Sequence, residues 1–154
     1  MKSKKWTVIV AAALAVCETV TFAYRKPDHS GTTGQSKQEP PVQVQFITPE
    51  ELKTKIANNE PVAIIDLRGQ SSFEQSDQTI KGSLHTKVRR VASRLRDVPR
   101  DRDVITYCAC PADEAATIAA RMLLANGFKR VRVLKGGWNA WLQAGGQVQP
   151  KPKL

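Results

Sequence analysis

The stretch DVITYCACPADEAATIAARMLLANGFKRVRVL, residues 103–134, decides the fold class. It contains two short apolar runs, residues 103–108 and 130–134, on either side of a longer segment with helical periodicity. Short continuous apolar runs are typical of strands that are buried on both faces. A strand, a helix and a second strand in about thirty residues form a βαβ unit. We therefore expect an α/β domain with a parallel sheet and helices on its faces.

The helix of this unit is predicted over residues 113–127. Asn126-Gly127 is a typical helix stop. Spacings of three and four residues predict a buried apolar stripe, made of Ala115, Ile118, Ala119 and Met122.

Two further segments complete the predicted core. PVAIID, residues 61–66, is a third buried strand, and ITPEEL before it opens a helix with a capping box between Thr48 and Glu51. Pro49 takes the first helical position. GGWNAWLQAGG, residues 136–146, predicts a last short helix whose tryptophans, Trp138 and Trp141, belong to the core.

The carboxyl ends of these strands carry the chemically interesting residues. Asp66-Leu67-Arg68 follows one strand, and Cys108 follows the next. Open parallel sheets bind ligands at the carboxyl ends of their strands. The pair Cys108 and Cys110 therefore lies where this fold class places its chemistry.

The N-terminus is predicted to export the chain. MKSKK is a positive segment, and an apolar run, residues 6–24, follows it. Thr21-Phe22-Ala23 is an acceptable cleavage site for a signal peptide. These nineteen residues, apolar apart from Glu18 and three threonines, also span roughly 28 Å as a helix, close to the hydrocarbon thickness of a bilayer. A cleaved signal peptide, residues 1–24, and an uncleaved membrane anchor both stay open, and both place the domain in the periplasm or elsewhere on the extracytoplasmic side.

Cys17 adds a third interpretation of this segment. Leu14-Ala15-Val16-Cys17 resembles a lipoprotein lipobox, although Val16 replaces the usual small residue. A buried apolar cysteine in a membrane segment is the favoured alternative.

A polar segment rich in Pro and Gly, residues 25–43, predicts a flexible linker. We expect the folded domain over residues 44–149 and a frayed tail over residues 150–154. The formal net charge is +10, which attracts anions in general and selects none of them.

Four segments together resemble a rhodanese-like domain. They are VAIIDLRGQSSFE, IKGSLH, VITYCAC and NGFKRVRVLKGGWNAWLQAGG, and they occur in the order and spacing of that family. The resemblance covers about residues 46–148. It implies a five-stranded parallel sheet with helices on both faces and an active cysteine that follows a central strand, here Cys108.

The loop after Cys108 departs from the family pattern. Active members usually continue with a short loop that contains Gly and often Arg or Lys, whereas this chain continues with ACPADEAA. Gln78-Thr79 also replaces the usual Gly-His. The resemblance therefore predicts the fold and leaves the substrate and the strength of catalysis open.

For Cys108 the resemblance implies sulfur transfer through a persulfide. A thiolate is the nucleophile, and helix N-termini stabilise thiolates. The reaction needs a small sulfane-sulfur donor and an acceptor, either a thiol or a protein partner, and no metal or organic cofactor. The alternative function is a weakly catalytic or non-catalytic module that carries sulfur or docks on a redox partner.

Cys110 has two interpretations. It is a candidate resolving thiol that accepts sulfur or closes a disulfide with Cys108, and an oxidising compartment favours such a bond. The slightly favoured alternative is a loop residue packed inward. Two cysteines fall short of the four ligands of a typical structural metal site, so we expect none.

The remaining site candidates are read as supporting residues. Asp66 and Arg68 are predicted to fix loops through hydrogen bonds and an ion pair, and His85 is expected to be structural. Pro111 shapes the loop. Asp113 is the predicted N-cap of the following helix, while Asp113 and Glu114 together would oppose anionic donors.

The stretch from Lys87 to Arg102 has seven basic and two acidic residues. Val88, Val91 and Leu95 predict an amphipathic helix with a solvated basic face. Contact with anionic headgroups or steering of an anionic donor are the alternatives. Aromatic interleaving is absent from this stretch, so nucleic acid is not an expected partner.

Overall fold

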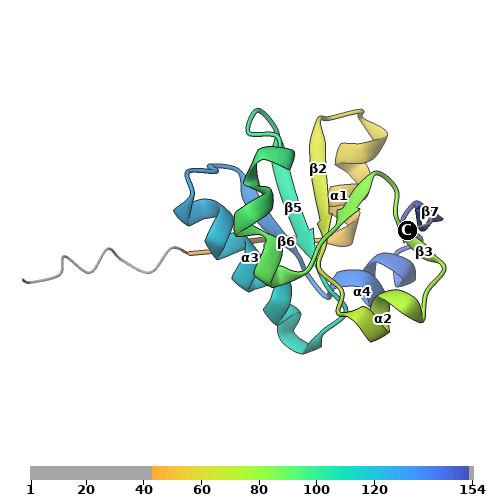
Figure 1. The fold of residues 1–154 in the computed structure, drawn as a ribbon. Coiled ribbons are helices and arrows are strands. Elements are labelled where there is room, and N and C mark those ends of the chain that lie inside the picture. Colours follow the sequence, from red (N-terminus) through yellow and green to blue (C-terminus); the bar gives the residue numbers. More distant parts are fainter. Residues whose placement is uncertain (1–42, 153–154) are drawn as a thin grey trace, which may run out of the picture. The chain divides into compact units, whose positions relative to one another are not determined.

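A five-stranded parallel sheet forms the centre of the computed structural model, which describes residues 43–152 (Figure 1). The strand order is β1-β6-β5-β2-β4. This confirms the α/β fold class with five parallel strands. The strands are β1 (Gln45–Ile47), β2 (Val62–Asp66), β4 (Ser83–His85), β5 (Asp103–Tyr107) and β6 (Val131–Leu134).

The central strand β5 pairs with β2 on one side and β6 on the other. Its register with β2 sets Asp66 opposite Tyr107. Both strands therefore end at one edge of the sheet, and the residues that follow them, Leu67 and Cys108, lie next to each other there.

Helices cover both faces of the sheet (Figure 1). One face packs against α1 (Pro49–Ala57) and α4 (Gly137–Gln143), and the other packs against α3 (Glu114–Ala125). A short helix, α2 (Gln70–Glu74), follows β2. Within residues 43–152 no helix is both long and apolar enough to cross a bilayer.

Local sequence explains where the helices begin and end. The predicted capping box of α1 is confirmed: Thr48 Oγ1 accepts the Glu51 N–H at 3.2 Å, and Glu51 Oε2 accepts the Thr48 N–H at 2.9 Å. The predicted stop of α3 is also confirmed, since Gly127 follows it with a φ of +84°. That left-handed conformation suits glycine.

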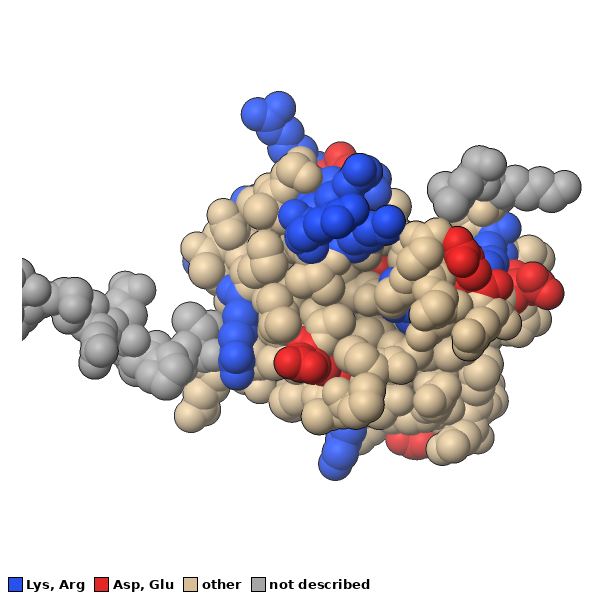
Figure 2. Space-filling view, turned by 60° about the horizontal axis from the view of Figure 1, so that its bottom comes forward, with Lys and Arg blue, Asp and Glu red and all other residues tan. Residues whose placement is uncertain are grey.

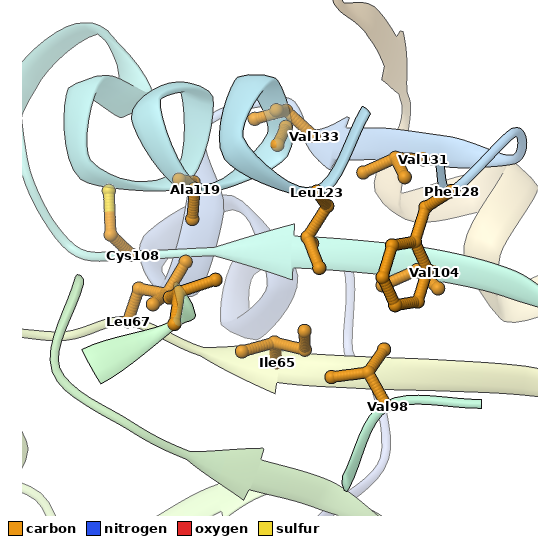
Figure 3. Close-up of a cluster of buried hydrophobic side chains, with 13 residues drawn as sticks. Ile65, Leu67, Val98, Val104, Cys108, Ala119, Leu123, Phe128, Val131 and Val133 are labelled. Carbon is orange, nitrogen blue, oxygen red and sulfur yellow. The ribbon is translucent and has the colours of Figure 1, made fainter. Parts of the chain in front are cut away.

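The two sheet faces bury separate apolar clusters. Alternation along β5 directs Ile105 and Tyr107 toward the cluster under α1 and α4, which also holds both predicted core tryptophans, Trp138 and Trp141. Val104 and Cys108 belong to the other cluster, beneath α3. Figure 3 shows this second cluster. Ile65 of β2 and Leu67, which directly follows β2, face Ala119 and Leu123 of α3.

The predicted apolar stripe of α3 is wrong in part. The fully buried residues are Ala116, Ala119, Ala120 and Leu123, whereas Ile118 is 42% exposed. Every residue of α3 except Glu114, Thr117 and Arg121 is apolar, so several stripes fit the spacing equally well. The structure selects the stripe with three alanines, because small side chains let the helix backbone approach the sheet closely.

The predicted amphipathic helix between Lys87 and Arg102 is also wrong. This stretch forms two 3-10 segments, η1 (Val88–Arg90) and η2 (Ala92–Asp97). The backbone leaves helical geometry at Arg94, where φ is −112°, and Pro99 stops any continuation. Val91 is nevertheless buried, as its apolar side chain suggests.

A small antiparallel sheet was not predicted. It joins β3 (Gln78–Ile80) to β7 (Val148–Pro150), and the Lys151 N–H donates to the Asp77 carbonyl at 2.9 Å. The predicted frayed tail, residues 150–154, is therefore wrong at Pro150 and Lys151, which both belong to this sheet contact. The predicted leader and Cys17 lie outside the described residues, as does nearly all of the predicted linker.

Replacing one buried and one exposed side chain of α3 by alanine tests which face of the helix packs on the sheet. Leu123→Ala should lower the free energy of unfolding by about 2–5 kcal/mol, because it leaves a cavity in the core. The matched variant Ile118→Ala removes an exposed side chain and should change it by less than about 0.5 kcal/mol. Urea unfolding of both variants measures the difference, and equal losses would contradict the assigned face.

Candidate active site

Cys108 directly follows β5 and begins the loop to α3. Its side chain is 1% exposed and packs in the apolar cluster beneath α3. Figure 3 shows its sulfur directed toward the N-terminal end of α3, with Leu67 nearby. The strand end thus holds this sulfur at the base of the loop.

Cys110 is joined to Cys108 by a disulfide. The two Cα atoms are 5.7 Å apart, within the range usual for disulfides. Cys110 is only partly buried, and its Sγ accepts the Ala115 N–H, in the first turn of α3, at 3.4 Å. Its packing against the apolar cluster also matches the alternative of an inward-facing residue. Its role as a resolving thiol stays a prediction.

The loop that follows has an unusual backbone. Pro111–Asp113 forms a 3-10 turn, η3, with Pro111 at its first position. Ala112 and Asp113 have φ values of +53° and +54°. Two consecutive residues in the left-handed region are uncommon without glycine, and they turn the chain sharply from the strand into α3.

The predicted capping role of Asp113 is wrong. It stands at the N-cap position of α3, but its side chain makes no capping hydrogen bond. N-cap residues are normally extended, whereas Asp113 is left-handed. Its buried carboxylate instead accepts the Gly136 N–H at 2.8 Å, in the turn between β6 and α4. Glu114 is exposed in the first turn of α3, where a negative charge interacts favourably with the helix dipole.

The turn before α4 is pressed against the cysteine loop. The Trp138 N–H donates to the Cys108 carbonyl at 2.8 Å. A Cβ at position 137 would lie 2.1 Å from the same carbonyl oxygen, and φ there is +52°. Only glycine fits this position, so Gly137 allows the close approach that fixes the backbone of Cys108.

Asp66 and Arg68 form the ion pair expected from the sequence. Arg68 Nη2 donates to Asp66 Oδ2 at 2.7 Å, and both side chains are completely buried. The guanidinium lies 4.2 Å from the Trp138 ring centroid, and Nη2 also donates to the Gln78 carbonyl at 3.0 Å. The pair therefore links the end of β2 to β3 and α4.

A buried hydroxyl network surrounds this carboxylate. Thr79 Oγ1 donates to Asp66 Oδ2 at 3.0 Å and lies 2.9 Å from Tyr107 Oη. Burial alone would raise the pKa of Asp66, but the hydrogen bonds from Arg68 outweigh it and hold that pKa well below its usual range. Burial, with the charge of Asp66, raises the pKa of Tyr107. At neutral pH the carboxylate is ionised and the phenol is protonated.

His85 is a structural residue in this arrangement, as the sequence suggests. Its ring stacks on Phe73 with centroids 3.7 Å apart, and its Nδ1 lies 3.8 Å from Asp66 Oδ1. That separation is too long for a hydrogen bond. Thr79, not a histidine, supplies the hydroxyl that binds Asp66.

A pocket of about 520 Å³ opens beside the two cysteines. Its lining includes Arg68, Lys87 and Arg89, together with Cys108 and Cys110. Lys87 and Arg89 are exposed at its rim. Figure 2, which brings the lower side of Figure 1 forward, shows one dense cluster of Lys and Arg side chains and several others scattered over the same face.

Sequence reasoning missed these two residues as pocket residues. The loop after Cys108 contains no basic residue. Lys87 and Arg89 nevertheless line the same pocket, from the segment at the start of η1. The sequence feature that could have identified them is the basic stretch from Lys87 to Arg102. Steering of an anionic donor was only one of the interpretations considered for it. Among residues 43–152 no three His, Cys, Asp or Glu side chains are placed to hold a metal ion.

Comparison with known proteins identifies the fold family. The family model of the rhodanese-like domain matches residues 48–144. The chain belongs to this family. A sulfurtransferase from Allochromatium vinosum is 31% identical over 102 residues, which cover 66% of this chain and 92% of the relative.

Two other similarities agree with this assignment. The thiosulfate sulfurtransferase GlpE from Coxiella burnetii is 25% identical over 87 residues, covering 56% of this chain and 78% of that protein. The solution structure of the rhodanese-like domain of the Alr3790 protein from Anabaena sp. has a TM-score of 0.59 and 27% identity. The match covers 71% of this chain and 81% of that one. The rhodanese-like family therefore accounts for the described domain.

The buried ion pair predicts how stability depends on pH. The folded pKa of Asp66 is depressed, so its contribution is complete above the unfolded value of about 3.9 and is lost as pH falls toward the folded value. Asp66→Asn leaves Arg68 buried without a counterion and should cost about 3–5 kcal/mol at neutral pH. The difference from wild type should shrink below about pH 4.

Urea unfolding at several pH values measures this effect. Asp97→Asn is the matched control, because Asp97 is an exposed acid and its replacement should leave the pH profile almost unchanged. A neutral-pH stability of Asp66→Asn equal to that of wild type would contradict the role given to the pair.

Proposed function

We propose that the protein transfers sulfane sulfur through a persulfide on Cys108. The observation that carries the proposal is the position of Cys108 at the carboxyl end of β5, on a pocket with Lys87 and Arg89 at its rim. Relatives named as sulfurtransferases support the same reaction class. The acceptor is a thiol, free or on a partner protein.

The reaction begins once a thiol or dithiol has reduced the disulfide. The Cys108 thiolate attacks the outer sulfur of thiosulfate, the sulfur–sulfur bond of the donor breaks, and sulfite leaves with the electron pair. An acceptor thiolate then attacks the outer sulfur of the persulfide, and Cys108 leaves as a thiolate. Sulfur moves in two covalent steps, and neither step requires a metal.

The charges around the pocket suit an anionic donor. Lys87 and Arg89 are exposed at the rim, and their positive charges attract a dianion such as thiosulfate. Glu114 is exposed on the first turn of α3, and its negative charge repels such a dianion. Asp113 contributes less to donor choice, because its buried carboxylate is bound to the Gly136 N–H.

Neutralising the rim tests this electrostatic role. Lys87→Gln with Arg89→Gln should lower kcat/KM for thiosulfate roughly tenfold at low salt, about 0.7 kcal/mol for each charge. The loss should fade at high ionic strength, where the charges are screened. Arg90→Gln is the matched control, because Arg90 is an exposed base in η1 outside the pocket lining.

Initial rates of sulfite release in the presence of an acceptor thiol, at two salt concentrations, provide the measurement. Cys108→Ser should release none. Equal rates for the rim variant, Arg90→Gln and wild type would show that the basic rim does not select the donor.

A weakly catalytic sulfur carrier or docking module is the second candidate function. The observation that favours it is that Cys108 is almost fully buried and disulfide-bonded, so the thiolate becomes available only after reduction. Turnover by the reduced protein distinguishes the two functions: a carrier takes up one sulfur and hands it on slowly to small thiols.

We also propose that the chain works outside the cytoplasm, either released or attached to the membrane through residues 6–24. The positive MKSKK segment and the apolar run after it support this location. A periplasmically active reporter fused after Leu154 should be active, while a reporter that works only in the cytoplasm should be silent. Activity of the cytoplasmic reporter would contradict export.

A further inference from the structure

We propose that Cys110 resolves the Cys108 persulfide and releases hydrosulfide, so that the site reduces sulfane sulfur as well as transferring it. This inference rests on the proposed function, because it begins from the same persulfide. It assigns a second product to the site and a chemical step to Cys110.

The disulfide shows that the two sulfurs meet in the folded backbone. Cys108 and Cys110 are separated only by Ala109, and their Cα atoms lie 5.7 Å apart. This separation falls inside the usual range for disulfides, so the bond forms with the loop in its folded arrangement. Cys110 therefore reaches Cys108 Sγ without unfolding of the domain.

The environment of Cys110 suits a nucleophile. Its Sγ accepts the Ala115 N–H from the first turn of α3, a helix of 12 residues. Free N–H groups and the dipole at a helix N-terminus stabilise negative charge on a nearby sulfur. The positive rim residues Lys87 and Arg89 line the same pocket and act in the same direction.

The burial of Cys108 favours the internal thiol over an external one. Cys108 is 1% exposed and lies beneath α3, so an acceptor thiol must enter the pocket to reach a persulfide there. Cys110 already lines that pocket, two residues along the chain. A reactant held in place has a large advantage over one that must diffuse in.

The step balances with the groups that are present. The Cys110 thiolate attacks Sγ of the Cys108 persulfide, and a bond forms between the two cysteine sulfurs. The bond from Cys108 Sγ to the outer sulfur breaks, and that sulfur leaves with the electron pair, takes a proton from water and becomes hydrosulfide. The Cys110 sulfur is oxidised, and the outer sulfur is reduced.

The disulfide that results is the state seen in the structure. A dithiol reductant restores the site: its first thiolate attacks Cys110 Sγ, the more exposed sulfur, and Cys108 leaves as a thiolate. The second thiol of the reductant then releases Cys110 and closes a disulfide in the reductant. Each cycle consumes one dithiol and one sulfane sulfur.

A single-turnover experiment tests the inference. The full-length chain carries Cys17→Ser in all samples, so that only the two site thiols react. Reduced protein, freed of reductant under nitrogen, receives one equivalent of thiosulfate, and sulfite and sulfide are measured in the same sample. Sulfite reports loading of Cys108, and sulfide reports its resolution.

The Cys17→Ser parent should release sulfite and then nearly one equivalent of sulfide, and its mass should show a disulfide. The Cys110→Ser variant should release the same sulfite, retain one extra sulfur on Cys108 and release sulfide at least tenfold more slowly. Equal loading of the two proteins shows that the variant is folded.

Two outcomes would overturn the inference alone: a parent that releases sulfite but keeps a stable persulfide, or a Cys110→Ser variant that releases sulfide as fast as the parent. Absence of sulfite from both proteins would instead overturn the proposed function, and the inference with it.

Discussion

The buried ion pair between Asp66 and Arg68 holds the active edge of the sheet together. A buried charge is tolerated only when its partner and its hydrogen bonds are in place, and here β3 and α4 both contact the pair. Thr79 donates to the carboxylate, while the guanidinium binds the Gln78 carbonyl and lies over the Trp138 ring. Because each segment satisfies part of the same charge pair, β3 and α4 are fixed relative to the end of β2. The cysteine loop rests on that fixed frame.

The loop itself is braced from α4 rather than by its own helix cap. The Cys108 carbonyl accepts the Trp138 N–H, and the carboxylate of Asp113 accepts the Gly136 N–H. These two hydrogen bonds hold the loop at its first residue, Cys108, and at its last residue before α3, Asp113. Between them the backbone passes through the left-handed conformations of Ala112 and Asp113. Such a conformation persists only when the surroundings hold it, and this explains why a buried acid occupies a position that is usually a simple cap.

The sequence predicts the parallel sheet well because the signals for it are local. Continuous apolar runs define β2, β5 and β6, and the capping box defines the start of α1. The site is less predictable, because its parts come together only through the tertiary fold. Lys87 and Arg89 belong to a stretch that resembles an amphipathic helix, but the stretch forms two 3-10 segments instead, and only its first residues line the pocket. Asp113 looks like an N-cap, and its actual partner, Gly136, is distant in sequence. The face of α3 was ambiguous because nearly all of its residues are apolar.

The two cysteines of the site differ in burial and in their contacts. Cys108 is buried in the core and held through its carbonyl, so its sulfur is fixed in position and shielded from competing reactants. Cys110 is more exposed and bound to the N-terminus of α3, so its sulfur meets the pocket and the solvent. In the proposed persulfide mechanism, an incoming thiol would meet Cys110 first and a sulfur bound to Cys108 second. A loop with one cysteine, however well placed, could hold sulfur but could not connect its release to a change of redox state. In the proposed mechanism, Cys110 couples the release of sulfur to the change of redox state, and it does so from two residues along the chain.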